Sequence, residues 1–461
     1  MSMIKPLPAL AAAVILLFSS CQKNTDSLTT NLAPGGNGNT GSSSTAQLNT
    51  AAFEAAKDYY LWNNLLPSTY DATGFADPAA VMTDIRKYSR ETGFTAAVDR
   101  WSFAMKKTEW DALSGGMSTV AGTADGAGDL GINVFFRAEG DLRVSLVEPA
   151  SPAGLAGIQR GWRITAINGN SSMNTTNSNF IVNAVYNSGS GSFKFTKPDG
   201  SPVTVTLNAA HYTTKPVYMD TVYSTPAGKV GYLVYNSFLG DQSKISAEYN
   251  RVFTKFANAG INHLVVDLRY NGGGYVSLQQ QLADYIVSAS ANGSVMFKQI
   301  YNTSHTSENS TVTFHKNGGV NLPKVYFIVG RSTASASELL INNLKPYMDV
   351  RLIGAGNTHG KPVGFFPIED GEWYVFPVSF KTVNKNNEGN YYNGFAPDAR
   401  VADGLDKNWG DITEASLASA LRNITSGSYR GAAEPVYDEP AVLMSGNTAL
   451  DAPLMKLTIG Q

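Results

Sequence analysis

The second half of the chain alternates short β-branched, apolar runs with longer amphipathic runs, and this alternation limits the possible folds more than any other feature. The strands it predicts span 229–238, 263–270, 324–330 and 349–356, and the helices span 243–260, 275–288 and 336–347. Gly260 ends the first helix. Strands that alternate with helices indicate an α/β domain around a central sheet. We place this domain at 211–425.

Other modules flank this domain, as expected for 461 residues at about 150 residues per domain. Apolar residues at helical spacing, interrupted by Pro67 and Pro78, predict a small helical region over 47–117. Short strands with Gly-containing turns predict a β-rich domain over 118–210. Residues 426–461 show no strong periodicity and are interpreted as an appendage. The predicted fold class is therefore multidomain α+β.

Composition excludes several kinds of protein. The 35 basic and 37 acidic residues give a net charge of −2 without a basic stripe, which argues against nucleic-acid binding. The single cysteine permits neither an intrachain disulfide nor a thiolate zinc cluster. The five histidines form no HExxH pair, so a zinc metalloprotease is excluded. We expect no metal and no cofactor.

Residues 1–21 have the form of a signal peptide, with Lys5, an apolar run and small residues before Cys21. This ending resembles a bacterial lipobox, which implies cleavage before Cys21 and lipid on its thiol. A conventional signal peptide with a bystander cysteine is the alternative. Residues 22–46 are rich in Ser, Thr, Asn and Gly and are predicted to be a flexible tether. The expected location is the bacterial cell envelope, lipid-anchored at the periplasmic or outer-membrane face.

The β-rich span resembles a PDZ domain. The segment GDLGINV (128–134) corresponds to that family's carboxylate-binding loop, and SPAGLAGIQRGWRITAINGNS (151–171) matches its next conserved stretch, with Trp162 in place of an Asp. In PDZ domains a peptide adds as a strand to the sheet edge and its C-terminal carboxylate binds backbone N–H groups. The peptide-binding residues implied here are Gly128, Leu130, Gly131 and Ile132. The alternative is a glycine bend in a domain that binds nothing.

Three segments of the α/β domain resemble the S41 family of C-terminal (tail-specific) processing peptidases. They are HLVVDLRYNGGGY (263–275), GRSTASASELLINNLK (330–345) and GAGNTHGKPVG (354–364), with a further match at 397–401. The resemblance implies a crotonase-like α/β fold for the peptidase domain and cleavage of proteins near their C-termini.

The residues themselves point to a serine nucleophile with a lysine base. A serine hydroxyl needs a base, and these segments contain no GxSxG elbow. Ser335 is the predicted nucleophile and Lys361 the predicted base. Lys361 must be neutral to accept a proton, so its pKa has to fall from about 10.4 through burial. The apolar residues that follow it are suited to bury it: Pro362, Val363, Phe365 and Phe366.

Structural roles compete with the catalytic ones. Ser335 and Glu338 also fit a capping box at a helix start, and Ser337 is an alternative cap. The family motif points to the first serine, Ser335, as the nucleophile. His359 is the runner-up base or a substrate contact, and the favoured interpretation is that it is neither. Asp267 and Arg269 are expected to form a structural pair.

By resemblance, the N–H groups of Gly273 and Ala336 form the oxyanion hole, and a plain glycine turn is the alternative. Two departures from the family pattern stand out. Phe365 occupies the position where many members have a Gln, and the loop that contains Ala355–Asn357 is one residue longer.

Together these features predict a serine endopeptidase that acts on proteins with free C-terminal tails. The PDZ-like domain would capture the tail, and lipid on Cys21 would hold the chain at a membrane. The alternative is a catalytically inactive, S41-like peptide- or ligand-binding surface lipoprotein, which the missing Gln favours.

Overall fold

The computed structural model describes residues 44–117, 128–431 and 436–459, with side chains up to residue 450. The predicted signal peptide, Cys21 and nearly all of the predicted tether lie outside these ranges. Within them, the structure contains no helix long and apolar enough to cross a membrane.

The N-terminal region is helical, as predicted, but it begins slightly earlier and also contributes a strand. Its elements are α1 (Thr45–Tyr59), α2 (Pro78–Ile85), β1 (Phe103–Lys106) and α3 (Lys107–Ser114). Pro78, expected to break a helix, is the first residue of α2, where its missing N–H costs nothing, and Asp77 caps that helix. β1 pairs antiparallel with β16 (Trp373–Phe376), a strand of the C-terminal half. The N-terminal region is therefore joined to the peptidase-like domain.

The β-rich domain is a five-stranded sheet in the order β2-β3-β4-β5-β6. Its strands are β2 (Ile132–Ala138), β3 (Asp141–Val147), β4 (Arg163–Ile167), β5 (Ser190–Thr196) and β6 (Pro202–Asn208). Two helices accompany them, α4 (Pro152–Leu155) and α5 (Ser178–Tyr186). β2 is an edge strand of this sheet, and α5 contributes buried side chains to the core beneath it.

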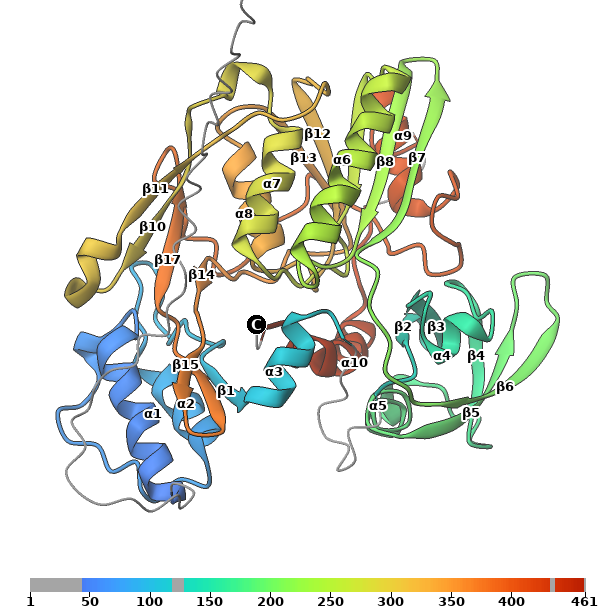
Figure 1. The fold of residues 1–461 in the computed structure, drawn as a ribbon. Coiled ribbons are helices and arrows are strands. Elements are labelled where there is room, and N and C mark those ends of the chain that lie inside the picture. The colour runs from blue at the N-terminus through green and yellow to red at the C-terminus, as the bar shows by residue number, and fades with distance from the viewer. Residues whose placement is uncertain (1–43, 118–127, 432–435, 460–461) are drawn as a thin grey trace, which may run out of the picture. The chain divides into compact units, whose positions relative to one another are not determined.

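The central sheet has six strands in the order β18-β13-β12-β9-β8-β7 (Figure 1). They are β7 (Val217–Thr225), β8 (Gly228–Tyr235), β9 (His263–Asp267), β12 (Lys324–Val329), β13 (Asp349–Gly354) and β18 (Ala399–Arg400). All neighbours are parallel except β7 with β8. The predicted alternation of strands and helices is confirmed, with boundaries within a few residues of those expected.

Helices cover both faces of this sheet. They are α6 (Gln242–Ala259), α7 (Val276–Ile286), α8 (Ala336–Leu344) and α9 (Ala415–Ser426). Successive residues of a strand point to opposite faces. In β8, Leu233 packs with the side chains of α6, α7 and α8, whereas Tyr232 and Val234 pack with Leu417 of α9. Gly260 ends α6 in the left-handed conformation, as the sequence predicts.

A second, irregular sheet was not anticipated from the sequence. It has the order β11-β10-β17-β14, and a separate hairpin carries β15 (Ile368–Asp370) and β16. The four strands are β10 (Val295–Tyr301), β11 (Ser310–Thr313), β14 (Val363–Gly364) and β17 (Phe380–Asn384). Most are short, and β10 pairs not only with the nearby β11 but also with β17, which is remote in sequence, so no local pattern marks the sheet as a whole.

The predicted C-terminal appendage is in part an ordered helix, which corrects the interpretation made from its weak periodicity. α10 (Ala441–Ile459) packs against β2 and α5 of the β-rich domain. Leu443 and Leu450 of α10 are buried in the same core as β2. The structure therefore supplies a partner surface that the sequence pattern did not reveal.

Candidate active site

The three motif segments follow adjacent parallel strands. They come directly after β9, β12 and β13, whose carboxyl ends meet at one edge of the sheet. The segments are bonded to one another there. Ala334 N–H donates to Asn271 O at 3.0 Å, and His359 N–H donates to Thr333 O at 2.9 Å. The structure thus brings together the segments that carry Ser335, Lys361 and Gly273.

Ser335 has a backbone conformation that serine rarely adopts. Its φ is 54° and its ψ is −115°, and it lies immediately before α8 as the N-cap residue. Such a conformation costs a non-glycine residue about 1–3 kcal/mol and concentrates at functional sites. The side chain is half-buried at the positive end of the α8 dipole. The alternative cap, Ser337, lies inside α8, and its hydroxyl donates to Asn271 O at 3.0 Å.

The predicted capping box of Ser335 and Glu338 is present, and the same Glu338 carboxylate also binds the loop that carries Lys361, called the lysine loop below. Glu338 Oε2 accepts the N–H of Ser335 at 3.1 Å and the N–H of Lys361 at 2.8 Å. Glu338 Oε1 accepts the Thr358 hydroxyl and the Gly360 N–H, both at 2.6 Å. Burial raises the pKa of Glu338 to about 7, although the four donors oppose the shift. Glu338 therefore fixes the serine and lysine segments to each other.

Lys361 is buried, with only 1% of its surface exposed. Its Nζ lies 4.0 Å from the centroid of the Phe365 ring. Burial lowers the pKa of Lys361 to about 7, although the negative charges of Asp99 and Glu338 oppose the shift. The expected burial by the residues that follow Lys361 is thus present, and Phe365 provides it at the position where many S41 members have a Gln. An amine with this pKa is half neutral near pH 7 and is suited to act as a base.

The lysine loop is hydrogen-bonded to residues of the N-terminal region. These residues were not singled out from the sequence. Arg100 Nη2 donates to the carbonyl oxygens of His359 and Gly360, both at 3.4 Å. The Trp101 indole N–H donates to His359 Nε2 at 3.1 Å. Burial lowers the pKa of His359 to about 3, so the ring is neutral. Because Nε2 already accepts the indole N–H, His359 has a structural role and is a poor candidate for the base.

Asp99 is the acidic group of this N-terminal segment and is also buried. Its carboxylate accepts the backbone N–H groups of Trp101 and Ser102. It also accepts the Tyr60 hydroxyl at 3.0 Å and the Ser102 hydroxyl at 2.6 Å. Its charge is the largest electrostatic influence that favours the protonated form of Lys361. No local motif marks the influence of Asp99 on Lys361, because the two residues are far apart in the sequence.

Gly273 lies directly against the serine. Its φ is 103°, and a Cβ added to it would lie 2.8 Å from Ser335 Cβ and 2.9 Å from Ala336 N. The N–H of Ala336, at the first turn of α8, has no intrahelical acceptor by position. The N–H of Gly273 donates to Asn271 Oδ1 at 2.9 Å. The two predicted oxyanion donors are therefore adjacent to Ser335, and Gly273 would have to share or release its bond to Asn271 to serve.

Asp267 and Arg269 form the structural pair that the sequence predicts. The carboxylate accepts Arg269 Nε at 3.0 Å and Nη2 at 2.7 Å, and both residues are buried. Arg269 also pairs with Glu414 and Asp403. Arg160 of the β-rich domain reaches the same Asp403 at 2.6 Å. This buried cluster thus connects the β-rich domain to the central sheet.

The predicted peptide-binding loop precedes β2. Gly128 and Gly131 have φ values of 78° and 76°, and Leu130 and Ile132 are buried. A Cβ on Gly131 would lie 1.9 Å from the Ser151 side chain, so only glycine fits there. The glycines are thus required by the path of the loop, whatever it binds.

Two family models match the chain. Residues 229–401 match the model described as Peptidase family S41, and residues 47–103 match the one described as Peptidase S41 N-terminal domain. The first match includes all three motif segments, and the second includes Asp99, Arg100 and Trp101. The resemblance drawn from the motifs is confirmed.

Curated relatives and a solved structure agree with these matches. A "Probable CtpA-like serine protease" of Staphylococcus saprophyticus is 26% identical over 326 residues, 68% of this chain and 61% of the relative. A "Carboxyl-terminal-processing protease" of Picosynechococcus is 26% identical over 257 residues, 54% of this chain and 58% of the relative. The chain thus spans about three fifths of their length. The crystal structure of a "Putative S41 protease" from Bacteroides fragilis has a TM-score of 0.63 and 22% identity, and covers 85% of this chain and 98% of that one. This likeness confirms the fold class.

Proposed function

We propose that this chain, which carries the peptidase S41 domain at residues 229–401 behind that family's N-terminal domain, is a serine endopeptidase that cleaves proteins near their C-termini. Ser335 is the nucleophile and Lys361 is the base. One observation carries the proposal: a serine with positive φ at a helix start and a buried lysine with a pKa of about 7 both donate their backbone N–H to the same carboxylate, that of Glu338.

The chemistry proceeds in two halves. Neutral Lys361 accepts the hydroxyl proton of Ser335 as Oγ bonds to the scissile carbonyl carbon. The negative charge on the carbonyl oxygen is stabilised by the N–H of Ala336 and the α8 dipole, with Gly273 as the second donor. Protonated Lys361 then gives its proton to the leaving amine as the C–N bond breaks. Water, deprotonated by Lys361, hydrolyses the resulting ester and releases Ser335.

The β-rich domain is proposed to act as a PDZ-like module that captures the free C-terminal tail of a substrate. Its glycine loop, edge strand β2 and helix α5 provide the parts of such a groove. The proposal also retains a lipid anchor on Cys21 and a location in the bacterial envelope, both of which rest on the sequence of residues 1–21 alone.

A fluorophosphonate probe tests the nucleophile because it reacts only with an activated serine. Wild-type protein should be labelled on Ser335, and Ser335→Ala and Lys361→Ala should lose both labelling and cleavage of an unstructured protein while their circular dichroism is unchanged. Lys345→Ala is the matched control, since Lys345 also lies over an aromatic ring, that of Phe395, at 3.7 Å. It should be labelled like the wild type.

A binding protein without turnover is the second candidate. Phe365 in place of a Gln, and the bond between Gly273 N–H and Asn271, favour it. Absence of labelling from pH 6 to 10 in the wild type would support this candidate and reject the peptidase.

A further inference from the structure

The free edge of β2 is already occupied. β2 pairs only with β3 within its sheet, so the outward N–H and C=O groups of alternate residues need other partners. Val134 N–H donates to the hydroxyl of Tyr186, the last residue of α5, at 3.0 Å. Phe136 N–H donates to Asn447 Oδ1 at 2.7 Å, and Phe136 O accepts Asn447 Nδ2 at 3.0 Å. The side-chain amide of Asn447 therefore reproduces the pair of bonds that an added β-strand would make.

The apolar side of α10 completes the contact. Leu443 and Leu450 are seven residues apart and lie on the same face of the helix as Asn447. Both leucines belong to the core that includes Val134 of β2 and Ile181 of α5. At Gly446 the helix comes so close that an added Cβ would lie 2.6 Å from Thr175 Cγ2. α10 is thus seated against both walls of the groove between β2 and α5.

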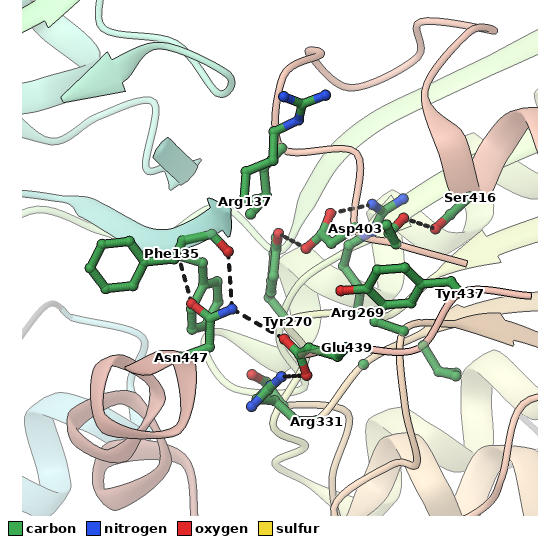
Figure 2. A pocket seen from close by; sticks show the side chains of 17 residues that line it. Phe135, Arg137, Arg269, Tyr270, Arg331, Asp403, Ser416, Tyr437, Glu439 and Asn447 are labelled. Carbon is green, nitrogen blue, oxygen red and sulfur yellow. Dashed lines mark hydrogen bonds and ion pairs between the residues drawn. The ribbon is translucent and has the colours of Figure 1, made fainter. Parts of the chain in front are cut away.

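The C-terminal segment, residues 437–450, is also bound by Arg331 of the peptidase domain (Figure 2). Arg331, four residues before Ser335 in sequence, donates to Met444 O at 3.2 Å and to the Thr448 hydroxyl at 3.1 Å. Arg331 pairs with Glu439, which in turn accepts Asn447 Nδ2 at 3.2 Å. The pocket in Figure 2 is lined by residues of β2, by Arg331, Glu439 and Asn447, and by the Asp403 cluster, and its lining includes neither Ser335 nor Lys361.

We propose that the groove between β2 and α5 is a docking surface for the chain's own C-terminal segment, residues 437–450, and that this segment competes there with substrate tails. The inference rests on the proposed function in one respect, that the same groove receives the tails. A tail that adds to β2 needs the N–H and C=O of Phe136, and both are bonded to Asn447. Capture of a tail therefore requires release of α10.

A peptide-binding measurement on the full chain tests the competition. The probe is a fluorescein-labelled ten-residue peptide with an apolar C-terminal residue and a free carboxylate. Asn447→Ala removes both bonds to Phe136 and should tighten binding about tenfold, since the groove is then open in a larger fraction of molecules. Val442→Ala is the control on the same helix, because Val442 is 52% exposed. Equal affinity for wild type and Asn447→Ala would overturn the proposal.

A reversible cross-link gives an independent test. In a Cys21→Ser background the chain has no cysteine, and Gly446→Cys with Thr175→Cys puts two thiols at the point of closest approach. The built Cβ of residue 446 lies 2.9 Å from Thr175 Cβ, so a shift of about 1 Å gives disulfide geometry. The oxidised protein should bind the peptide at least about tenfold more weakly than the same sample after reduction. Equal binding in both forms would contradict the docking of α10 in this groove.

Labelling of Ser335 in the same variants separates the two proposals. Labelling of the wild type together with unchanged peptide affinity in Asn447→Ala rejects the docking inference and leaves the peptidase. No labelling together with tighter peptide binding in Asn447→Ala rejects the peptidase and supports the docking inference.

Discussion

The Oε2 atom of Glu338 accepts the backbone N–H of Lys361 at 2.8 Å. The same oxygen accepts the N–H of Ser335 at 3.1 Å, so one carboxylate takes part in the capping box of α8 and also joins the segments that carry Ser335 and Lys361. The capping box and the active site, which are alternatives from the sequence, coexist in the structure.

The activity should rise with pH through about 7. The pKa of Lys361 is lowered to about 7, so the base is protonated below that pH and neutral above it. The rate of fluorophosphonate labelling, measured from pH 5 to 9, should increase tenfold per pH unit on the acidic limb and level off above pH 7 to 8. A rate that is constant from pH 5 to 9 would contradict a titrating lysine base.

The same shift should appear in stability. The folded-state pKa of Lys361 lies below its unfolded value of 10.5, so between pH 7 and 10.5 the unfolded state binds more protons. The contribution of Lys361 to the free energy of unfolding therefore increases with pH across that window. Lys361→Met should be more stable than the wild type below pH 7, and the difference should shrink as the pH rises. Urea denaturation at pH 6, 8 and 10 measures the difference in the free energy of unfolding between the two proteins. A difference that grows with pH would contradict the lowered pKa of Lys361.

Glu338→Gln should move the acidic limb of the pH–rate profile to lower pH. The charge of Glu338 raises the pKa of Lys361, and the amide keeps the shape of the carboxylate without the charge. We expect a shift of up to about one pH unit together with a lower maximal rate, because one oxygen is lost as an acceptor. Glu388→Gln is the control, and its profile should match that of the wild type. A limb that moves upward in Glu338→Gln would be inconsistent with this electrostatic role.

Gly273→Ala should remove activity. Its Cβ would lie 2.8 Å from Ser335 Cβ, and its φ of 103° is strained for alanine. Displacement of the nucleophile and of an oxyanion donor should lower kcat/KM by at least about 100-fold. Gly356→Ala is the matched control, since an added Cβ there meets nothing within 4 Å. It should retain most of the activity; similar losses in both variants would point to general damage to the loops.

Trp101→Phe, a substitution in the N-terminal region, should lower the catalytic rate. It keeps an aromatic ring and removes the indole N–H that binds His359 Nε2 at 3.1 Å. The buried nitrogen is left without this donor, which should cost about 1–3 kcal/mol of stability, and kcat should fall more than KM changes. His359→Gln retains an acceptor and should stay labelled by the fluorophosphonate. Complete loss of labelling in His359→Gln would instead identify His359 as the base.

Arg160→Ala should strongly destabilise the protein. Arg160 is 2% exposed and binds Asp403, Tyr270 and the Ser145 carbonyl. Its loss leaves part of a buried charge cluster uncompensated, which costs about 3–5 kcal/mol, whereas Arg351→Ala at the surface should cost about 1 kcal/mol or less. Urea denaturation of the two variants measures the difference, and equal midpoints would argue against the cluster.

The regular part of the fold was predictable because its signals are local. The strand and helix runs of the central sheet, Gly260 at the end of α6 and the three motif segments all follow from residues close together in the sequence. Parallel strands place the loops that follow them at one edge, so the approach of the segments that carry Ser335 and Lys361 was also predictable.

The remaining features depend on contacts between distant segments. Asp99 and Trp101 approach the lysine loop across more than 250 residues, and no spacing rule links them. The strands of the second sheet find partners far along the chain. α10 has no strong amphipathic pattern, and its place follows from the unpaired edge of β2, which exists only after the sheet has formed.

The sequence by itself determined the order of the modules, the alternation around the central sheet and the residue types proposed for the nucleophile and the base, because these depend on neighbouring residues. The tertiary structure alone decided the backbone strain at Ser335, the approach of Asp99 to Lys361 and the occupant of the β2 edge. Each of these depends on contacts between segments that are remote in sequence, and such contacts have no local sequence signature.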